Sequence, residues 1–138
     1  MRPHFLVAAA LALATSACRT AYSPELLVAP VRDVQLDVTG TWNTHWDEYL
    51  AVVTLTQQGA HVTATYTTTA RPSPGEAGTL EGSLEGTLEG NVLRGTWTEG
   101  GDRFGRFRWV FRTDGRSFEG AWGHASLEDD GGPWAGTR

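Results

Sequence analysis

The side chains that could do chemistry are few and scattered along the chain. His45, Asp47 and Glu48 lie close together, while His61 and His124 lie elsewhere. Histidine and carboxylate groups are the usual protein ligands of zinc, but their spacing here matches no ligand motif. No serine stands in a Gly-x-Ser-x-Gly nucleophile elbow, and the glycines do not precede helical patterns. We therefore expect no metal, no cofactor and no enzymatic activity.

Arginines are concentrated late in the chain, and two interpretations of them stay open. They could form a patch for an anionic ligand such as lipopolysaccharide, or they could pair across strands with glutamates on the same outer surface. The arginines are Arg103, Arg106, Arg108, Arg112 and Arg116, and the glutamates are Glu81, Glu85, Glu89, Glu99 and Glu119. Similar numbers favour cross-strand pairing. The net charge of −5 argues against a nucleic-acid partner.

Cys18 is the one cysteine of the chain, so an intrachain disulfide is impossible. A basic start, an apolar run over 5–14 and small residues up to Ala17 are typical of a secretory signal peptide. The run is shorter than the roughly 20 residues that span a bilayer. The position of Cys18 resembles the lipid-attachment cysteine of bacterial lipoproteins: Ser16 and Ala17 fit that pattern, whereas Thr15 replaces the preferred leucine.

This resemblance implies a lipid anchor on Cys18, which would hold the protein to a membrane of the bacterial cell envelope. Arg19 follows the cysteine, and by analogy with enterobacterial sorting it favours the outer membrane. If Cys18 is not lipidated, cleavage after Ala17 would give a secreted or periplasmic protein. An uncleaved segment is the third alternative.

The rest of the chain divides into a tether and one domain. We predict a signal peptide over 1–17, a lipidated cysteine and flexible tether over 18–33, and a β-domain over 34–138. Apolar and polar residues alternate with period two in most of this domain, which is typical of half-buried strands. The segments are 34–46, 49–57, 60–69, 80–91, 92–98, 103–112, 117–123 and 134–138.

Residues 80–91 repeat Leu-Glu-Gly every four positions. A strand would place every leucine and glycine on one face and every glutamate on the other. A helix would align Glu81, Glu85 and Glu89 in a like-charged row and would carry glycines at about 1 kcal/mol each. The pattern therefore predicts either one bent strand or two strands joined near 86–90.

About eight strands in succession, joined by short turns such as Asp114-Gly115, predict an all-β fold. An antiparallel meander of this size removes its free edges most simply by closing into a small barrel. Glycine and tryptophan share a strand face repeatedly, as in Gly40-x-Trp42 and Gly95-x-Trp97. Glycine there would let a neighbouring ring lie over bare backbone.

These features resemble the calycin superfamily, which includes lipocalins and avidins. Residues 39–42 (Thr-Gly-Thr-Trp) are similar to the avidin opening, and Tyr66 stands where avidins carry a strand-borne tyrosine. The resemblance implies that Arg138 covers Trp42. Thr44 replaces the biotin-binding asparagine of avidins, so biotin binding is not implied. Small metalloprotease inhibitors of the envelope share this barrel class.

Two functional hypotheses follow. In the first, a non-enzymatic envelope lipoprotein binds a small apolar or amphipathic ligand inside its barrel, at Trp46, Tyr49, Tyr66 and Trp134. In the second, the barrel is solid and binds an envelope protein or a protease through a loop at 70–78 or 124–133. An interior that is hollow near those four aromatic residues would favour the first hypothesis.

Overall fold

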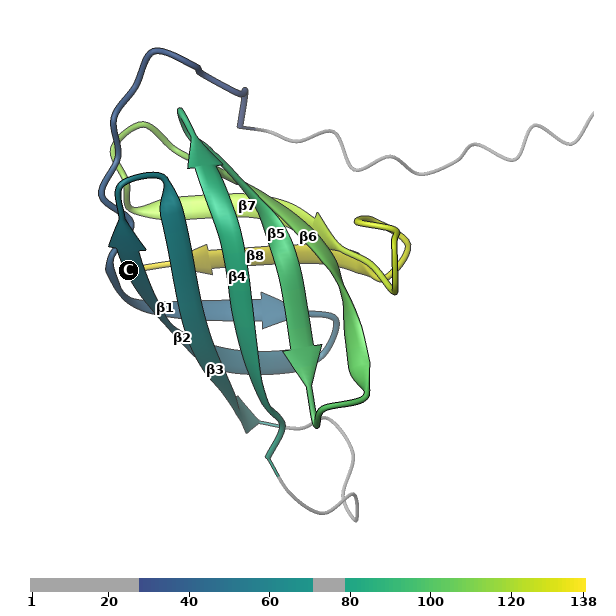
Figure 1. The fold of residues 1–138 in the computed structure, drawn as a ribbon. Helices are drawn as coiled ribbons and strands as arrows, with labels where there is room; N and C mark the ends of the chain where they lie inside the picture. The colour runs from purple at the N-terminus through teal and green to yellow at the C-terminus, as the bar shows by residue number, and fades with distance from the viewer. Residues whose placement is uncertain (1–27, 71–78) are drawn as a thin grey trace, which may run out of the picture.

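The computed structural model describes residues 28–70 and 79–138, and these residues form strands and turns without a helix (Figure 1). The predicted signal peptide, Cys18 and residues 71–78 lie outside the described residues. The strands are β1 (Gly40–Trp46), β2 (Tyr49–Gln58), β3 (His61–Ala70), β4 (Glu81–Glu89), β5 (Val92–Glu99), β6 (Arg103–Phe111), β7 (Ser117–Trp122) and β8 (Gly132–Thr137).

The strands form a closed antiparallel barrel in sequence order, which confirms the predicted fold. Each strand pairs with the next, and β8 pairs with β1 to close the sheet. Because the strands alternate in direction, the β1–β2, β5–β6 and β7–β8 connections lie at one end, which we call the mouth end. The β2–β3, β4–β5 and β6–β7 turns lie at the opposite end (Figure 1).

The Leu-Glu-Gly run forms one strand, β4, rather than two. Leu84 and Leu88 are buried, while Glu85 and Glu89 are exposed, as the period predicts. The strand ends at Glu89 and the chain turns at residues 90–91. The first and last strands differ from the expected ranges, since β1 begins at Gly40 and β8 already begins at Gly132.

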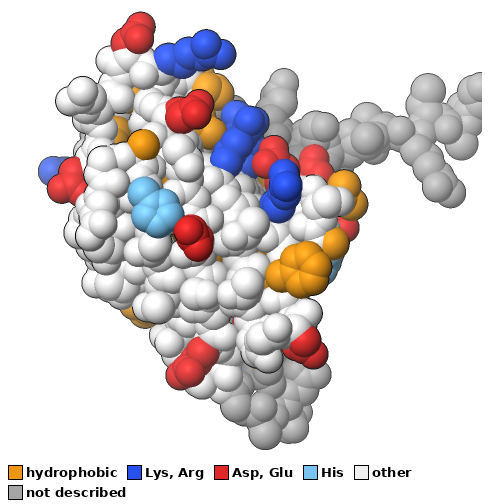
Figure 2. All heavy atoms as spheres, viewed as in Figure 1, with side chains coloured by type: hydrophobic (Ala, Val, Ile, Leu, Met, Phe, Trp, Pro, Cys, Tyr) orange, Lys and Arg blue, Asp and Glu red, His pale blue; other side chains and the backbone are white. Residues whose placement is uncertain are grey.

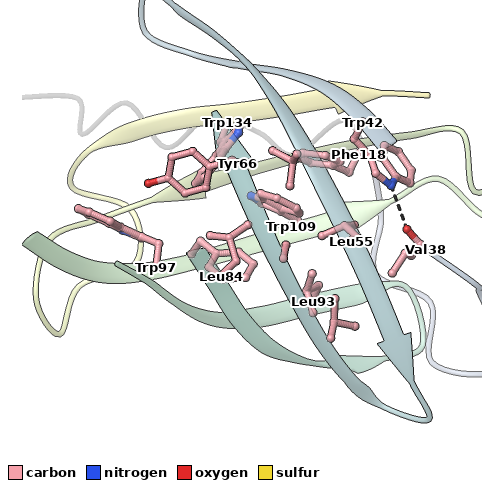
Figure 3. Packing of buried hydrophobic residues seen from close by; sticks show 14 of the residues in the cluster. Val38, Trp42, Leu55, Tyr66, Leu84, Leu93, Trp97, Trp109, Phe118 and Trp134 are labelled. Carbon is pink, nitrogen blue, oxygen red and sulfur yellow. Dashed lines mark hydrogen bonds between the residues drawn. The ribbon is translucent and has the colours of Figure 1, made fainter. Parts of the chain in front are cut away.

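Aromatic rings fill the middle of the barrel. Trp109 stacks on Phe118 with 4.0 Å between ring centroids, and Trp42 meets Phe111 edge-on at 5.2 Å. These side chains are almost fully buried (Figure 3). Offset and edge-to-face rings of this kind stabilise a core beyond the area they bury. The barrel is therefore packed solid through its middle, and space for a ligand remains at the mouth end.

Residues 28–39 close the end opposite the mouth. Asn91, fully buried in the β4–β5 turn, donates from Nδ2 to the carbonyls of Ala29 (3.0 Å) and Phe111 (2.7 Å), and its Oδ1 accepts from the Val31 amide. Val28 and Val38 are buried. The described part of the predicted tether, residues 28–33, thus lies against the barrel and is held there by hydrogen bonds.

Arg138 covers Trp42, as the calycin resemblance implied. Its guanidinium carbon lies 4.7 Å from the centroid of the indole ring. The guanidinium also donates to the carbonyls of Gly115 (2.7 Å), Thr39 (2.8 Å) and Asp37 (2.9 Å). The end of the chain is thereby attached to the segment before β1 and to the β6–β7 turn.

Candidate ligand-binding pocket

A pocket of about 180 Å³ opens at the mouth end of the barrel, and we call it the mouth pocket. Seven of the eight strands contribute to it directly, and Leu80 contributes from the position just before β4. Its lining consists of Trp46, Asp47, Tyr49, Tyr66, Leu80, Trp97, Glu99, Arg103, Trp122 and Trp134. The four residues predicted to bind a ligand, Trp46, Tyr49, Tyr66 and Trp134, are all among them.

Strand register brings three of these aromatic residues into one row. Trp46 of β1 lies opposite Tyr49 of β2 and opposite Trp134 of β8. The Trp46 ring stacks on Tyr49 at 5.8 Å and packs against Trp134 at 4.6 Å between centroids. Period two puts all three side chains on the inner face. They form an apolar wall at the mouth.

A second row crosses four strands and is polar. Register places Tyr66, Gly82, Glu99 and Arg103 side by side on β3, β4, β5 and β6. Gly82 has no side chain, and a Cβ there would collide with the Tyr66 ring. The ring therefore lies across β4, and its hydroxyl donates to Glu99 Oε2 at 2.7 Å. Glycine under a ring is thus what lets tyrosine reach a carboxylate two strands away.

Arg103 completes this row from the solvent side. Its Nη1 lies 2.9 Å from Glu99 Oε1, and its side chain is 56% exposed against 8% for Glu99. The Glu99 carboxylate consequently has one partner on each oxygen. A buried charge is tolerated only when it is paired and hydrogen-bonded in this way.

Burial raises the pKa of the Tyr66 phenol far above its ordinary value, and the hydrogen bond to Glu99 raises this pKa further. The hydroxyl therefore keeps its proton and remains a donor throughout the neutral and mildly alkaline range. The polar row therefore presents a phenol, a carboxylate and a guanidinium to the pocket.

The floor and side of the pocket are made by further tryptophans. Trp97 donates from its indole nitrogen to the Gly123 carbonyl at 2.9 Å, which fixes the ring, and Trp122 meets it edge-on at 5.8 Å. Trp134 packs edge-on against Trp109 of the core at 4.9 Å (Figure 3). The pocket therefore ends where the packed core begins.

The assignment of Glu99 to the outer surface was wrong. Glu99 is 7% exposed and faces inward, because it shares the period of Leu93 and Trp97 on β5. Arg103 pairs with this inward carboxylate. Trp97 belongs to the buried core cluster and Trp122 packs against it, and both also line the pocket. No part in the pocket was predicted from the sequence for Asp47 or Leu80.

Asp47 reaches the pocket from the β1–β2 turn. It adopts a left-handed backbone conformation with φ of 48°, which aspartate tolerates better than most residues. In residues 28–70 and 79–138, no three histidine, cysteine or acidic side chains gather as a metal site would require. His45 and His61 are exposed on the outer face of the barrel.

Together, the topology and the pocket define a small closed antiparallel barrel with an aromatic pocket at one end. Comparison with protein-family models, with curated proteins and with solved structures found no match for this chain. No helix in the described part of the chain is long and apolar enough to cross a membrane.

Proposed function

We propose that the chain is a non-enzymatic binding protein whose mouth pocket holds one small amphipathic molecule. The observation that carries this proposal is the contrast between the two walls. Trp46, Tyr49 and Trp134 form the apolar wall of the pocket, and Tyr66, Glu99 and Arg103 form a polar row that starts where the Tyr66 ring packs edge-on against Trp46 and Trp134. Ligand pockets typically combine apolar lining with a few polar groups that fix orientation.

The size of the pocket restricts the ligand. A cavity of roughly 150 Å³ in another protein binds benzene, and the mouth pocket measures about 180 Å³. The ligand is therefore a molecule of about one ring with a polar substituent. A long acyl chain would meet the packed Trp109 and Phe118 below the floor.

The test is a binding screen on the purified chain with four small aromatic probes: phenol, benzylamine and benzoate, which have one ring, and the bicyclic indole. Ligand-observed NMR detects binding, and a native mass spectrum before and after denaturation detects any molecule already bound. Tyr49→Ala removes a half-buried pocket residue. Leu50→Ala changes its neighbour on β2, which points outward and is 52% exposed, and serves as the matched control.

We expect at least one probe to bind and Tyr49→Ala to weaken its binding about tenfold, because the aromatic contact is lost. Leu50→Ala should leave the affinity unchanged. Equal effects of both variants would place binding outside the pocket. A ligand-free chain that binds none of the probes would favour the alternative function, a module that binds an envelope protein or a protease. Leu127, 53% exposed in the β7–β8 loop, would be a contact residue in that case.

We further propose that Cys18 carries lipid and anchors the protein to the cell envelope, at the outer membrane. The support is the sequence pattern around Cys18 and the calycin-like barrel that follows it. Expression in a bacterium with radiolabelled palmitate tests this proposal directly. Label should enter the wild-type chain and be absent from Cys18→Ser. Label retained in Cys18→Ser would contradict lipid attachment at this residue.

A further inference from the structure

A second hollow lies on the outer surface of the barrel, between residues 30–32 and strands β4, β5 and β6. Its volume is about 290 Å³, and we call it the arginine groove. It is lined by Pro30, Val31, Arg32, Thr87, Glu89, Val92, Arg94 and Arg108. It lies toward the end opposite the mouth and shares no residue with the mouth pocket.

Strand register creates an unfavourable arrangement in this groove. Arg94 of β5 lies directly opposite Arg108 of β6, and like charges directly opposite each other destabilise a sheet. Arg32 joins them from the segment that Asn91 holds against the barrel. Figure 2 shows basic side chains close together on the upper part of the face formed by β4 and β5, with acidic side chains among them.

Acidic neighbours only partly offset this charge. Glu89 lines the groove, and Glu128 lies 3.9 Å from Arg94, with both side chains of that pair solvent-accessible. An exposed ion pair of this length contributes little to stability, so breaking it costs little free energy. Three guanidiniums in one groove therefore leave an excess of positive charge.

Arg108 also carries an unsatisfied donor. Its Nε atom is buried and has no hydrogen-bond partner among the described residues. Buried donors in folded proteins are almost always paired, so such an atom indicates a partner that the described residues do not supply. An acceptor bound in the groove would satisfy Arg108 and relieve its repulsion with Arg94 together.

We propose that the arginine groove binds a phosphate group, with Arg94 and Arg108 as its principal ligands and Arg32 as the third. A guanidinium offers parallel N–H donors that match two oxygens of one phosphate. Three guanidiniums around one site suit a tetrahedral anion with several oxygens better than a flat carboxylate. The phosphate could belong to a small soluble compound or to a lipid headgroup, and the chemistry of the site is the same for both.

The test uses the full chain labelled with ¹⁵N and follows the Nε–Hε resonances of its arginines. Inorganic phosphate is titrated against sodium chloride at matched ionic strength. Monomeric dihexanoylphosphatidylglycerol is titrated in parallel. Dihexanoylphosphatidylcholine is its control, because its phosphate is neutralised by the choline cation and the headgroup has no net charge. The variants are Arg94→Gln and Arg108→Gln. Arg116→Gln makes the same charge change at an exposed arginine of the β6–β7 turn, outside the groove.

We expect a saturable shift of the Arg108 Nε–Hε resonance that Arg94→Gln weakens at least tenfold and Arg116→Gln preserves, since a hydrogen bond to a charged group is lost. A response to inorganic phosphate identifies a soluble phosphate compound as the source. A response to phosphatidylglycerol alone identifies a lipid headgroup. If Arg108→Gln does not fold, the comparison of Arg94→Gln with Arg116→Gln decides the test. The proposal is overturned if chloride reproduces the shift of the Arg108 Nε–Hε resonance, or if Arg94→Gln retains this shift as fully as Arg116→Gln does.

Discussion

Replacing Tyr66 with phenylalanine tests the polar row of the mouth pocket. The Tyr66 hydroxyl lies 2.7 Å from Glu99 Oε2, and the Glu99 side chain is 8% exposed. A hydrogen bond to a charged group contributes about 1.5–3 kcal/mol to stability. Because Arg103 still pairs with the other oxygen, and the open mouth admits water, we expect a loss near the lower end, about 1.5 kcal/mol at pH 7.

The same substitution should change the response to alkaline pH. Burial raises the pKa of Tyr66 in the folded chain, whereas the unfolded chain has the ordinary value of 10.0. Above pH 10 the unfolded chain loses this proton while the folded chain keeps it. The free energy of unfolding therefore falls by about 1.4 kcal/mol per pH unit through this one group. Tyr66→Phe removes this pH-dependent contribution. Below pH 10 the tyrosine is protonated in both states, so its ionisation adds nothing to the stability difference between wild type and variant there.

The assay is urea unfolding followed by tryptophan fluorescence at pH 7, 9, 10 and 11. Tyr49→Phe is the matched control, because Tyr49 lines the same pocket but stacks on Trp46 through its ring. The wild-type and Tyr66→Phe curves should approach each other as the pH rises above 10. If Tyr66→Phe loses no more stability than Tyr49→Phe at pH 7 and keeps the wild-type slope above pH 10, the buried phenol–carboxylate contact is refuted.

Three further substitutions test how the barrel is closed; the first two are measured by urea unfolding and the third by hydrogen exchange. Arg138→Lys should lose about 1–2 kcal/mol, since lysine cannot donate to three carbonyls and cover the indole as the guanidinium does; wild-type stability would contradict this. Gly95→Ala should lose about 1–3 kcal/mol because its Cβ would collide with the β4 backbone. Gly101→Ala is the control without a collision, since a Cβ there meets open space and only the positive φ of 85° disfavours alanine. Asn91→Ala should expose the Val31 amide to hydrogen exchange, and protection equal to wild type would refute its role in holding residues 28–33.

The barrel was predictable because local patterns determine it. Alternation of period two defines the strands, and glycine-containing turns such as Asp114-Gly115 separate them. Once about eight strands follow one another with short turns, closure is the simplest way to remove sheet edges. Strand ends were less predictable: Val34 extends the alternation but lies before β1, which starts at Gly40.

The pocket was predictable only in part. Trp46 and Trp134 were correctly placed near strand ends, and the register brings them together. Glu99 follows the inward period of Trp97, yet a carboxylate is expected outside unless its partners are known. Its partner Tyr66 comes from a strand two positions away in the sheet. Which residues share a level in a barrel depends on the stagger of the strands, and this stagger cannot be read from one sequence.

The two proposed sites lie toward opposite ends of the barrel, and this separation has a functional consequence. The described part of the chain starts with Val28, which is buried at the end of the barrel away from the mouth. Residues 30–32, which follow it, line the arginine groove. An anchor at Cys18 would therefore attach the barrel by the end that carries the groove. The guanidiniums would then lie on the side from which the membrane phosphates approach, while the mouth pocket would remain open. Phosphate binding and ligand binding should consequently be independent, so Arg94→Gln should leave the affinity of the mouth pocket unchanged.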